Sequence, residues 1–507
     1  MTNWDGLDPT PQRLDRLVLR GRGGDIALVD RSGTLDFAAL DAAVGSLAAH
    51  LAERAAPGDR VASWLPKTRT ACLIALACAR AGLVHVPVNP LLKRAQVAHI
   101  LADSGARLLV TQPARASLLE PEDRPEGCDI VGEAALTAPH PAPLPPSTGD
   151  TEALAALLYT SGSTGRPKGV MLSHANLWLG AVAVGHYLRI TPEDRTLAVL
   201  PLSFDAGLNQ LLSTWAAGAS AVPLDYLVAG DVVKAIGRHG VTALSGVPPL
   251  WIQLAEANWP EETAARLRIL SATGGRMPAP LVRRLRALFP QASLHLMYGL
   301  TEAFRSTSLD PALADTHPES IGKAIPFAEI LVARADGSLA GPDEPGELVH
   351  VGPLVAQGYW RDAGRSALRF RPAPAGSRLG GTAVWSGDSV VRGADGLLRF
   401  VGRDDEMIKV SGNRISPTEI EEAAIASGAV SEAVALGVPD ARLGQAIRLV
   451  VRGAGDVAND GEARLRTYFK AELPNFQQPR DIVWVEALPR NPNGKLDRAA
   501  IAGEHGA

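Results

Sequence analysis

Glycines, hydroxyl side chains and a lysine are concentrated in residues 159–169, which read YTSGSTGRPKG between two apolar runs. Glycine lets the backbone approach a ligand closely, and hydroxyl and amide groups beside a lysine suit an anion. The segment therefore predicts a loop that binds a triphosphate. It is not a Walker A loop, because Pro167 precedes Lys168 and neither Ser nor Thr follows the lysine. A Gly- and Ser-rich surface loop is the alternative.

Four more segments that combine glycine with ionisable residues follow along the chain. They are Tyr298–Glu302 (YGLTE), Trp385–Asp388 (WSGD), the stretch from Gly402 to Ile415 that begins GRDD, and Pro492–Lys495 (PNGK). In this order, the five segments resemble the motifs of the adenylate-forming superfamily, which includes acyl-CoA synthetases, nonribosomal peptide synthetase adenylation domains and firefly luciferase. The resemblance covers roughly residues 25–500.

The resemblance implies an AMP-forming acid–thiol ligase that works in two half-reactions. A carboxylate first attacks the α-phosphorus of ATP, which gives an acyl adenylate and pyrophosphate. A phosphopantetheine thiol then displaces AMP and gives a thioester. Both reactants of the first half are anions, so the site must neutralise charge without moving them. The implied cofactors are ATP and Mg²⁺, with the thiol of CoA or of a carrier protein as acceptor.

The resemblance also implies a role for each motif residue. Lys495 would bridge the substrate carboxylate and the α-phosphate, Thr301 would contact the α-phosphate, and Glu302 would bind Mg²⁺, a hard cation that prefers oxygen ligands. Tyr298 would stack on adenine, and Asp388 would accept the ribose hydroxyls. The whole implied nucleotide site is Thr160, Ser161, Gly162, Ser163, Thr164, Gly165, Lys168, Gly274, Gly275, Tyr298, Asp388 and Arg403.

Two further residues would serve the second half-reaction, and several of the roles have structural alternatives. Asp405 would be the hinge between two domains, and Gly412 would line the pantetheine channel. Alternatively, Asp405 is an ordinary linker residue and Gly412 a hairpin glycine. Glu302 could be a charge near a helix N-terminus, Asp388 a turn residue, and Lys495 a solvated lysine in an Asn-Gly turn.

The acid pocket departs from the pattern of many acyl-CoA ligases, which carry a His or an aromatic residue after Pro-Leu. Residues 201–206 read PLSFDA and resemble the FDxS motif of amino-acid adenylation domains, with Gly207 in place of the final Ser. In that motif the aspartate, here Asp205, pairs with the substrate ammonium. Asp205 could also cap the helix that follows, because Asp is a favoured N-cap residue; the two roles are compatible.

An arginine is the unusual member of the implied acid pocket. A guanidinium that faces a small pocket needs an anion or a strong acceptor, since an unpaired buried charge is very costly. A salt bridge from Arg305 to a neighbouring acid would satisfy it. Otherwise Asp205 and Arg305 together predict an amino dicarboxylate, such as aspartate, glutamate or a β-amino relative. The implied pocket is Asp205, Asn209, Gly246, Ser271, Thr273, Met297, Arg305 and Ser306.

Three hypotheses about function follow. The chain looks most like stand-alone ligases that load amino acids, including the β-amino acids of macrolactam pathways, onto carrier proteins, and like acyl-CoA ligase-like proteins associated with exosortase loci. The leading hypothesis is therefore an aminoacyl–carrier-protein ligase. No LGG[DH]S carrier motif is found, so we expect the thiol to arrive on a discrete carrier protein or as CoA. An acyl-CoA ligase for a small non-amino acid is the second hypothesis, and a non-catalytic nucleotide-binding protein the third.

Composition narrows the class of protein. The 507 residues carry a formal net charge of −4 and are 46% hydrophobic, which suits a folded chain of more than one core. This charge gives no support for binding nucleic acid or an anionic membrane. We expect a cytoplasmic protein, because the N-terminus lacks a signal-peptide pattern and the three cysteines form no metal or disulfide pattern.

The elements that would hold these motifs alternate between strands and helices in the first part of the chain. Helical patterns at 38–52, 68–81 and 93–103 alternate with strand patterns at 60–65, 84–88 and 106–111, which predicts a parallel α/β domain. From about residue 321, Asp-Gly, Pro-Gly and Gly-Gly turns predict a β-rich, barrel-like subdomain. Residues 405–507 predict a small α+β domain that carries Lys495. The resemblance implies that this domain is mobile and that residues 1–404 form an N-terminal adenylation core.

Overall fold

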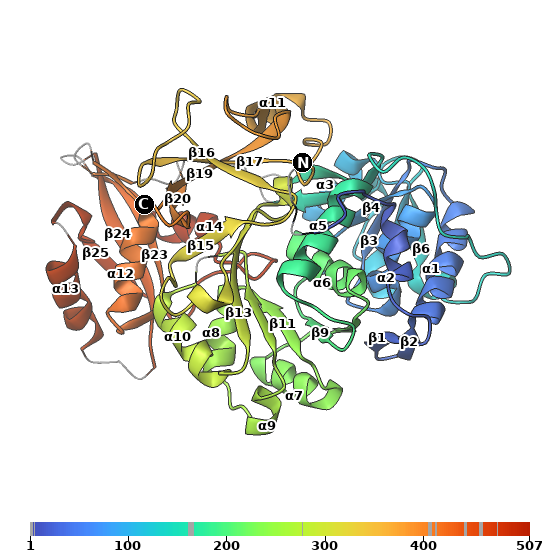
Figure 1. Ribbon diagram of the computed structural model, residues 1–507, viewed down its shortest axis with the longest axis horizontal. Coiled ribbons are helices and arrows are strands. Elements are labelled where there is room, and N and C mark those ends of the chain that lie inside the picture. Colours follow the sequence, from blue (N-terminus) through green and yellow to red (C-terminus); the bar gives the residue numbers. More distant parts are fainter. Residues whose placement is uncertain are drawn as a thin grey trace.

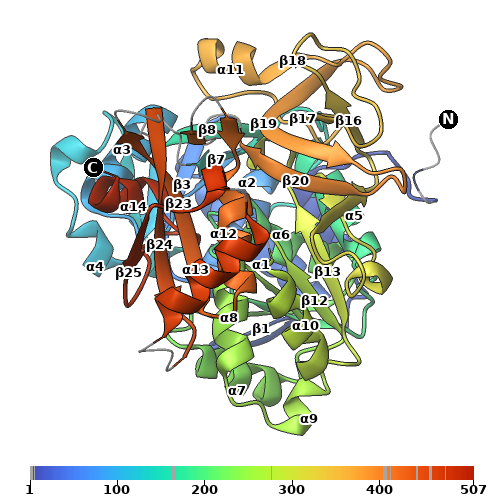
Figure 2. The same ribbon diagram turned by 90° about the vertical axis from the view of Figure 1, so that its left-hand side faces the viewer.

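The computed structural model describes residue 4 and residues 6–160, 167–275, 277–403, 408–410, 413–440, 444–455, 460–473 and 475–506. Figures 1 and 2 show a large N-terminal region, coloured blue to orange, and a smaller C-terminal region, coloured orange to red, packed against one side of it. The proposed boundary at residue 404 lies outside the described residues.

A six-stranded sheet forms the first layer of the N-terminal region. Its strands, in spatial order, are β6 (Asp129–Gly132), β5 (Leu108–Thr111), β3 (Arg60–Trp64), β4 (Val84–Pro87), β7 (Leu154–Thr160) and β8 (Lys168–Ser173). All neighbours pair in parallel except β7 and β8, which form an antiparallel pair on either side of the predicted phosphate loop. The helices of this part are α1 (Phe37–Ala52), α2 (Arg69–Arg80), α3 (Arg94–Ser104) and α4 (Pro113–Ala116).

A second, larger sheet has a parallel half. Its strands, in order from the centre to the edge, are β13 (Ser293–Tyr298), β12 (Ile269–Ala272), β11 (Ala243–Gly246), β9 (Arg195–Ala198), β10 (Ser220–Pro223), β1 (Ile26–Asp30) and the antiparallel edge strand β2 (Gly33–Asp36). Its helices are α5 (His174–Tyr187), α6 (Asp205–Ala216), α7 (Ala229–His239), α8 (Pro248–Glu256), α9 (Glu261–Ala264) and α10 (Ala279–Leu288).

The other half of the larger sheet is antiparallel and begins at β14 (Thr307–Ser308), somewhat before the expected position near residue 321. Its further strands are β15 (Ser320–Ala324), β20 (Leu398–Arg403), β19 (Thr382–Arg392), β17 (Pro345–Val351) and β16 (Glu329–Ala333), with β18 (Phe370–Pro372) beside β19 and α11 (Ala363–Arg369) before it. These strands continue the parallel sheet through β13, which links the β-rich subdomain directly to the α/β layers.

The core lies between the two sheets. One cluster of buried apolar side chains joins α1, α2, α5 and α6 to strands of both sheets, and Leu177, Leu211 and Trp215 in it are fully buried. Figure 1 shows α5 and α6 between the blue strands and the green strands. These helices are buried around most of their circumference because both faces are covered. The expected multilayer α/β fold is confirmed.

The C-terminal region is built on its own sheet and apolar cluster. The sheet has the order β22 (Asn413–Ile415), β21 (Ile408–Val410), β24 (Gly444–Gly453) and β23 (Val430–Asp440), and β25 (Asp481–Trp484) pairs with β24. Its helices are α12 (Pro417–Ala426), α13 (Gly461–Glu472) and α14 (Arg498–His505). α12 begins at Pro417, since proline suits the first position of a helix.

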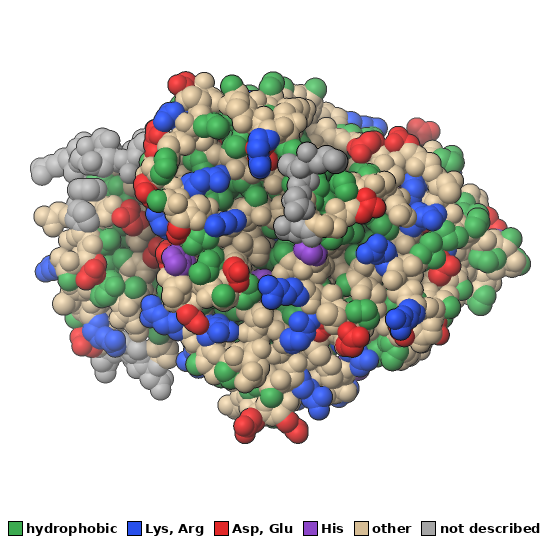
Figure 3. All heavy atoms as spheres, in the orientation of Figure 1, with side chains coloured by type: hydrophobic (Ala, Val, Ile, Leu, Met, Phe, Trp, Pro, Cys, Tyr) green, Lys and Arg blue, Asp and Glu red, His purple; other side chains and the backbone are tan. Residues whose placement is uncertain are grey.

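Surface and membrane features are limited. On the face drawn in Figure 3, basic and acidic side chains are interspersed over the molecule. Within the described part of the chain, no helix combines the length and the apolar character that a membrane span requires.

The departure from the FDxS pattern at Gly207 has a steric cause. A Cβ atom added at Gly207 would lie 1.8 Å from the carbonyl oxygen of Pro201, so the first turn of α6 packs directly on the preceding backbone. A serine cannot occupy this position without moving α6.

Gly207→Ala should therefore lower the free energy of unfolding by about 2 kcal/mol or more, because the clash is with backbone that cannot rotate away. Chemical denaturation measures this loss. Gly230→Ala in α7 is the matched control, because an added Cβ there meets nothing within 4 Å. This control should be neutral or slightly stabilising. Equal stability of the two variants would contradict the steric explanation.

Candidate active site

A cavity of about 300 Å³ lies between the N-terminal core and the C-terminal domain. Seven residues predicted from the motifs line it: Thr160, Lys168, Asp205, Thr301, Glu302, Asp388 and Lys495. They come from β7, β8, α6, the short 3₁₀ helix Thr301–Ala303, β19 and the segment before α14. The structure thus brings together one side chain or more from each of four motifs, and Lys495 enters the cavity from the C-terminal side.

A tyrosine hydroxyl links the lysine and the carboxylate at one end of this cavity. Lys168 Nζ donates to the hydroxyl of Tyr359 at 2.7 Å, and this hydroxyl donates to Glu302 Oε1 at 2.6 Å. Lys168 Nζ also lies 3.4 Å from Glu302 Oε1. Glu302 and Thr301 are each only 7% exposed. A buried carboxylate, a cation and a hydroxyl therefore form one compact group.

Burial and neighbouring charges act in opposite directions on this group. Burial alone would raise the pKa of Glu302, but Lys168 and the Tyr359 hydroxyl outweigh it and hold the pKa below its usual value. Burial lowers the pKa of Lys168, and Glu302 partly restores it. Burial, together with the Glu302 carboxylate, raises the pKa of Tyr359. Glu302 is therefore ionised at neutral pH, as an oxygen ligand for a divalent cation must be.

A second tyrosine contacts the aspartate on the other side of the cavity. The hydroxyl of Tyr298, at the end of β13, donates to Asp388 Oδ2. The backbone N–H of Asp388 donates to Ser386 Oγ at 3.1 Å, which fixes the turn of the WSGD segment. Arg403 on β20 is paired with Asp388 on β19, so the two predicted ribose-site residues lie opposite each other on neighbouring strands. The side chain of Arg403 lies outside the described part.

Lys495 is held in a tight loop. The backbone N–H of Lys495 donates to Asn491 Oδ1 at 3.1 Å, and its carbonyl accepts from the Asn491 N–H at 2.8 Å. Lys495 Nζ lies 4.8 Å from the centre of the Phe204 ring. Gly274 has φ +79°, and a Cβ there would come within 2.8 Å of Lys495 Cε, so this glycine makes room for the lysine stem. Gly275 stands next to it, against Pro248.

The acid pocket contains a buried ion pair. Arg305 Nη1 lies 2.9 Å from Asp205 Oδ2, and each side chain is only 3% exposed. Arg305 Nη1 also donates to the carbonyl of Phe304 at 2.7 Å. The salt bridge to a neighbouring acid, which the sequence left open, is thus present. Asp205 is not an N-cap: α6 begins at Asp205 itself, the N-cap residue is Phe204, and Asp205 Oδ1 accepts from the next N–H, that of Ala206.

A strained turn aims Arg305 at this pair. Phe304 has φ +60° and ψ −56°, and the N–H of Arg305 donates to the carbonyl of Ala303 at 2.6 Å, which makes a three-residue γ-turn of the rare, positive-φ kind. The buried Phe304 ring holds the turn in place, because it fills the space beside Gly180 in α5. Such strain persists only where the surrounding packing determines it, and it is common at functional sites.

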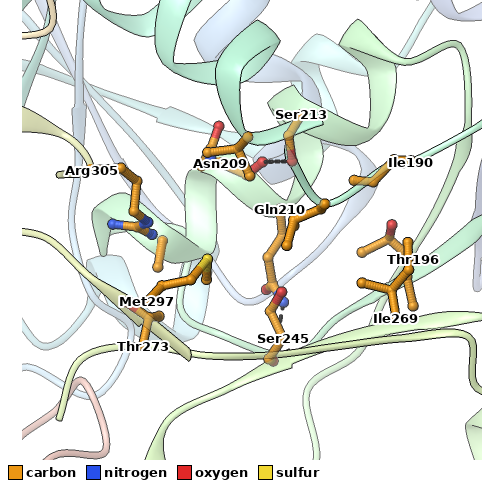
Figure 4. Close-up of a pocket in the computed structure, with 14 residues that line it drawn as sticks. Ile190, Thr196, Asn209, Gln210, Ser213, Ser245, Ile269, Thr273, Met297 and Arg305 are labelled. Atoms are coloured by element: carbon orange, nitrogen blue, oxygen red, sulfur yellow. Dashed lines mark hydrogen bonds between the residues drawn. The ribbon is translucent and has the colours of Figure 1, made fainter. Parts of the chain in front are cut away.

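A smaller cavity of about 20 Å³, room for roughly one water-sized group, lies beyond the ion pair. Figure 4 shows Arg305, Met297 and Thr273 at one end and Ile190, Thr196 and Ile269 at the other. Arg305 Nε and Asn209 Oδ1 are buried without a hydrogen-bond partner among the described residues. Four predicted pocket residues line this cavity: Asn209, Thr273, Met297 and Arg305.

The remaining predicted residues are placed differently or lie outside the described part. Ser306 donates to or accepts from His350 Nδ1 at 2.9 Å and is fully buried away from both cavities. Ser271 contacts the Ser245 hydroxyl, and Gly246 packs against Trp251, so both lie behind the pocket wall. The predicted site residues that lie outside the described part of the chain are Ser161, Gly162, Ser163, Thr164, Gly165, Asp405 and Gly412.

Several site residues have no signal in the sequence. Tyr359 lies 191 residues from Lys168 and 57 from Glu302 along the chain, so no spacing pattern connects them. Ser203, whose buried hydroxyl has no partner among the described residues, and Arg369 also line the larger cavity. Of these residues, only Ser203 has a clue to its position in the sequence, because it stands two residues before Asp205, which was itself predicted to lie in the site.

Comparisons with known proteins place the chain among enzymes of adenylate chemistry. A family model described as AMP-binding enzyme matches residues 16–360, and one described as AMP-binding enzyme C-terminal domain matches residues 419–495. The chain is 32% identical to feruloyl-CoA synthase from Amycolatopsis over 96% of this chain and 98% of the relative. It is 29% identical to an L-proline–[L-prolyl-carrier protein] ligase from Pseudomonas fluorescens over 94% and 95%.

A solved structure gives the same fold. The chain is similar to ATP-bound MatB from Rhodopseudomonas palustris with a TM-score of 0.86, at 26% identity and over 98% of this chain and 99% of that one. The match extends over both the N-terminal and the C-terminal regions.

Tyr359→Phe should weaken the binding of Mg²⁺–ATP about 5- to 10-fold, because it removes the hydroxyl that links Lys168 and Glu302. The ring still packs against Phe370 at 5.4 Å, so the melting temperature should change little. Titration calorimetry measures the affinity. Tyr187→Phe is the control: its hydroxyl contacts Met297 in the acid pocket and not the phosphate end. An unchanged ATP affinity in Tyr359→Phe would contradict this role.

Proposed function

Because the chain belongs to the AMP-binding enzyme family and is an AMP-forming acid–thiol ligase, we propose that its acid is an amino acid and its thiol the phosphopantetheine of a discrete carrier protein. The observation that supports the amino acid is Asp205, a buried carboxylate that lines the same cavity as Lys495. The prolyl-carrier protein ligase among the relatives shows that a stand-alone chain of this length can have a carrier protein as acceptor.

The proposed first half-reaction assigns a task to each charged group. A carboxylate oxygen of the acid forms a bond to the α-phosphorus while the bond from that phosphorus to the pyrophosphate oxygen breaks. Lys495 would hold the attacking carboxylate against the α-phosphate, and Thr301 would add a hydroxyl donor; both residues line the cavity. Lys168 would meet the β- and γ-phosphates, and Asp388 the ribose. Fixed charges of this kind lower the barrier because they need no reorganisation during the reaction.

The residues at Glu302 fit a magnesium ion. Its carboxylate is buried, ionised and next to the lysine that would meet the phosphates, so a cation bound to it would also reach phosphate oxygens. Bound there, Mg²⁺ would neutralise charge on the triphosphate. The binding of ATP exchanges the Lys168–Glu302 contact for contacts with the ligand, while Tyr359 stays bonded to Glu302.

The second half-reaction requires Lys495 to move out of the cavity so that the thiol can enter. The thiol sulfur attacks the acyl carbon, the bond from that carbon to the AMP oxygen breaks, and the thiol proton goes to solvent or to a base. We propose that Asp405 is the hinge for a rotation of the C-terminal domain and that Gly412 lines the channel through which the pantetheine arm then reaches the cavity. These two assignments rest on the motif resemblance alone.

The ion pair of Asp205 and Arg305 suits a substrate that carries two charges besides the activated carboxylate. An amino dicarboxylate keeps one ammonium and one carboxylate after adenylation. The ammonium would pair with Asp205 and the distal carboxylate with Arg305, whose Nε has no other partner among the described residues. One buried ion pair is then replaced by two, and no charge is left unpaired. We therefore propose aspartate, glutamate or a β-amino relative as the substrate class.

The same ion pair also favours a second candidate function. If the ion pair stays intact on substrate binding, Arg305 neutralises Asp205. The pocket then accepts an acid that carries no charge other than the carboxylate to be activated. In that case the enzyme is an acyl-CoA ligase for a small non-amino acid, which accords with the feruloyl-CoA synthase relative.

An ATP–pyrophosphate exchange screen tests the two candidates. The panel contains α- and β-amino acids, amino dicarboxylates, and deaminated acids of matched length. We expect exchange with amino substrates and little with their deaminated partners. Exchange with aryl or fatty acids alone would reject the amino-acid proposal. A second assay then compares CoA with a phosphopantetheinylated carrier protein as the acceptor.

Lys495→Ala should lower the rate of adenylation at least about 100-fold, because one preorganised charge at the reacting centre contributes roughly 3 kcal/mol. Thioester formation from a supplied acyl adenylate should suffer much less. The two rates are measured by pyrophosphate exchange and by single-turnover thiol transfer. Equal losses in both half-reactions would contradict a separate role for Lys495 in adenylation.

Arg305→Ala should lower kcat/KM for an amino dicarboxylate by an amount that corresponds to about 2–5 kcal/mol of lost transition-state stabilisation, because the distal carboxylate loses its partner. A neutral amino acid of similar length should lose little, since its ammonium pairs with the freed Asp205. Asp205→Ala should impair every amino substrate and spare deaminated ones. The double variant controls for an unpaired buried carboxylate. If Arg305→Ala impairs charged and neutral substrates equally, Arg305 is structural and the dicarboxylate proposal fails.

A further inference from the structure

Asn89 lies at the point where the N-terminal core meets the loop that carries Lys495. It follows strand β4 of the six-stranded sheet, and its side chain is 5% exposed. Asn89 Nδ2 donates to the carbonyl oxygen of Pro492 at 2.9 Å and to Asn493 Oδ1 at 3.2 Å. One core side chain thus contacts two residues of the PNGK motif across 403 and 404 positions of sequence.

The neighbours of Asn89 fix the orientation of its amide. Asn89 Oδ1 accepts from the backbone N–H of Leu91 at 2.9 Å, which requires an oxygen at that position. The carbonyl of Pro492 is an acceptor, so it requires the NH₂ group on the other side. The two ends of the amide therefore have separate tasks: the oxygen shapes the Asn89-Pro90 turn of the core, and the nitrogen holds the loop.

The loop transmits this contact to the lysine. Asn491 Oδ1 accepts from the N–H groups of both Asn493 and Lys495, at 3.0 and 3.1 Å, and the Asn491 N–H donates to the Lys495 carbonyl at 2.8 Å. The segment from Asn491 to Lys495 is therefore one hydrogen-bonded turn. Because Asn89 fixes Pro492 and Asn493 within this turn, it also limits where the Lys495 backbone stands relative to the cavity.

We propose that Asn89 is the positioning residue of the N-terminal core that docks the lysine loop for adenylation and for that half-reaction only. The inference rests on the proposed role of Lys495 in the first half-reaction. Asn89 touches neither ATP nor the acid in this role; it acts through the loop. When the C-terminal domain moves so that a thiol can enter, the hydrogen bonds from Asn89 Nδ2 break, while the bond from Leu91 to Asn89 Oδ1 remains within the core.

Asn89→Asp separates the two tasks of the side chain. It keeps an oxygen for the Leu91 N–H but turns a second acceptor toward the Pro492 carbonyl, so docking is lost while the local turn is kept. We expect adenylation to fall about 10- to 100-fold, as the loss of two hydrogen bonds and a new repulsion predict. Thioester formation from a supplied acyl adenylate should stay within about twofold. Asn89→Ala should show the same split with a smaller loss.

Asn176→Asp is the matched control. Asn176 has the same pattern, since its Oδ1 accepts a backbone N–H and its Nδ2 donates to the carbonyls of Pro353 and Val355, but all its partners lie inside the N-terminal core. This variant should lower the melting temperature and change both half-reactions by the same factor. Asn89→Asp should leave the melting temperature near that of the wild type and change only adenylation.

A readout independent of turnover is the modification of Lys495 by an amine reagent, followed by peptide mass spectrometry. Lys495 should react several-fold faster in Asn89→Asp than in the wild type. Equal losses in both half-reactions, or no loss in either, would overturn the proposal. If Lys495→Ala keeps its adenylation rate, the assigned role of Lys495 fails. If Lys495→Ala loses that rate and Asn89→Asp keeps it, only the docking role of Asn89 fails.

Discussion

The central constraint in this structure is electrostatic: a carboxylate and a triphosphate are both anions, and under the proposed mechanism Lys495 of the C-terminal region supplies part of the positive charge that lets them react. Lys495 belongs to the C-terminal region, yet it lines the same cavity as Glu302, Thr301 and Asp388 of the core. The surrounding residues must therefore leave space for the Lys495 side chain and fix the loop that carries it. Gly274 leaves room for its stem, and the loop around it is closed by Asn491. Under the proposed two-step mechanism, this charge is present for adenylation and absent for thioester formation.

The charged residues inside the core solve a related problem. Glu302 and Asp205 are buried carboxylates, and burial of an unpaired charge is very costly. In the structure each has a cation beside it, Lys168 for Glu302 and Arg305 for Asp205. Substrates can then bind by exchange of partners, in which each new contact replaces an old one. Such a site stays folded when empty and still presents charges of both signs to a ligand that carries both.

Much of this site was predictable because its motifs are local. Turns such as YGLTE and PNGK keep their functional groups within a few residues, so their types and order identify them. The helices of the core were also predictable, since α1, α2 and α3 lie within a residue of the expected bounds. The contacts between distant segments were not. Tyr359 reaches Glu302, and Asn89 reaches Pro492, only because the fold brings together segments that are far apart in the sequence.

The Asp205–Arg305 pair shows why composition of a pocket does not determine its specificity. A list of pocket residues contains an acid and a base, and each suggests a complementary group on the substrate. The structure adds that Arg305 Nη1 lies 2.9 Å from Asp205 Oδ2 and that the γ-turn at Phe304 fixes the position of Arg305. For a substrate whose charged groups bind to Asp205 or Arg305, the free energy of binding therefore includes the loss of this internal pair. A substrate with a single charge breaks the pair and leaves one partner uncompensated, whereas a substrate with both charges, or with neither, leaves every buried charge paired. Under the proposed assignment of the acid pocket, selectivity therefore depends first on the charge balance of the substrate beyond its activated carboxylate, and only then on its size.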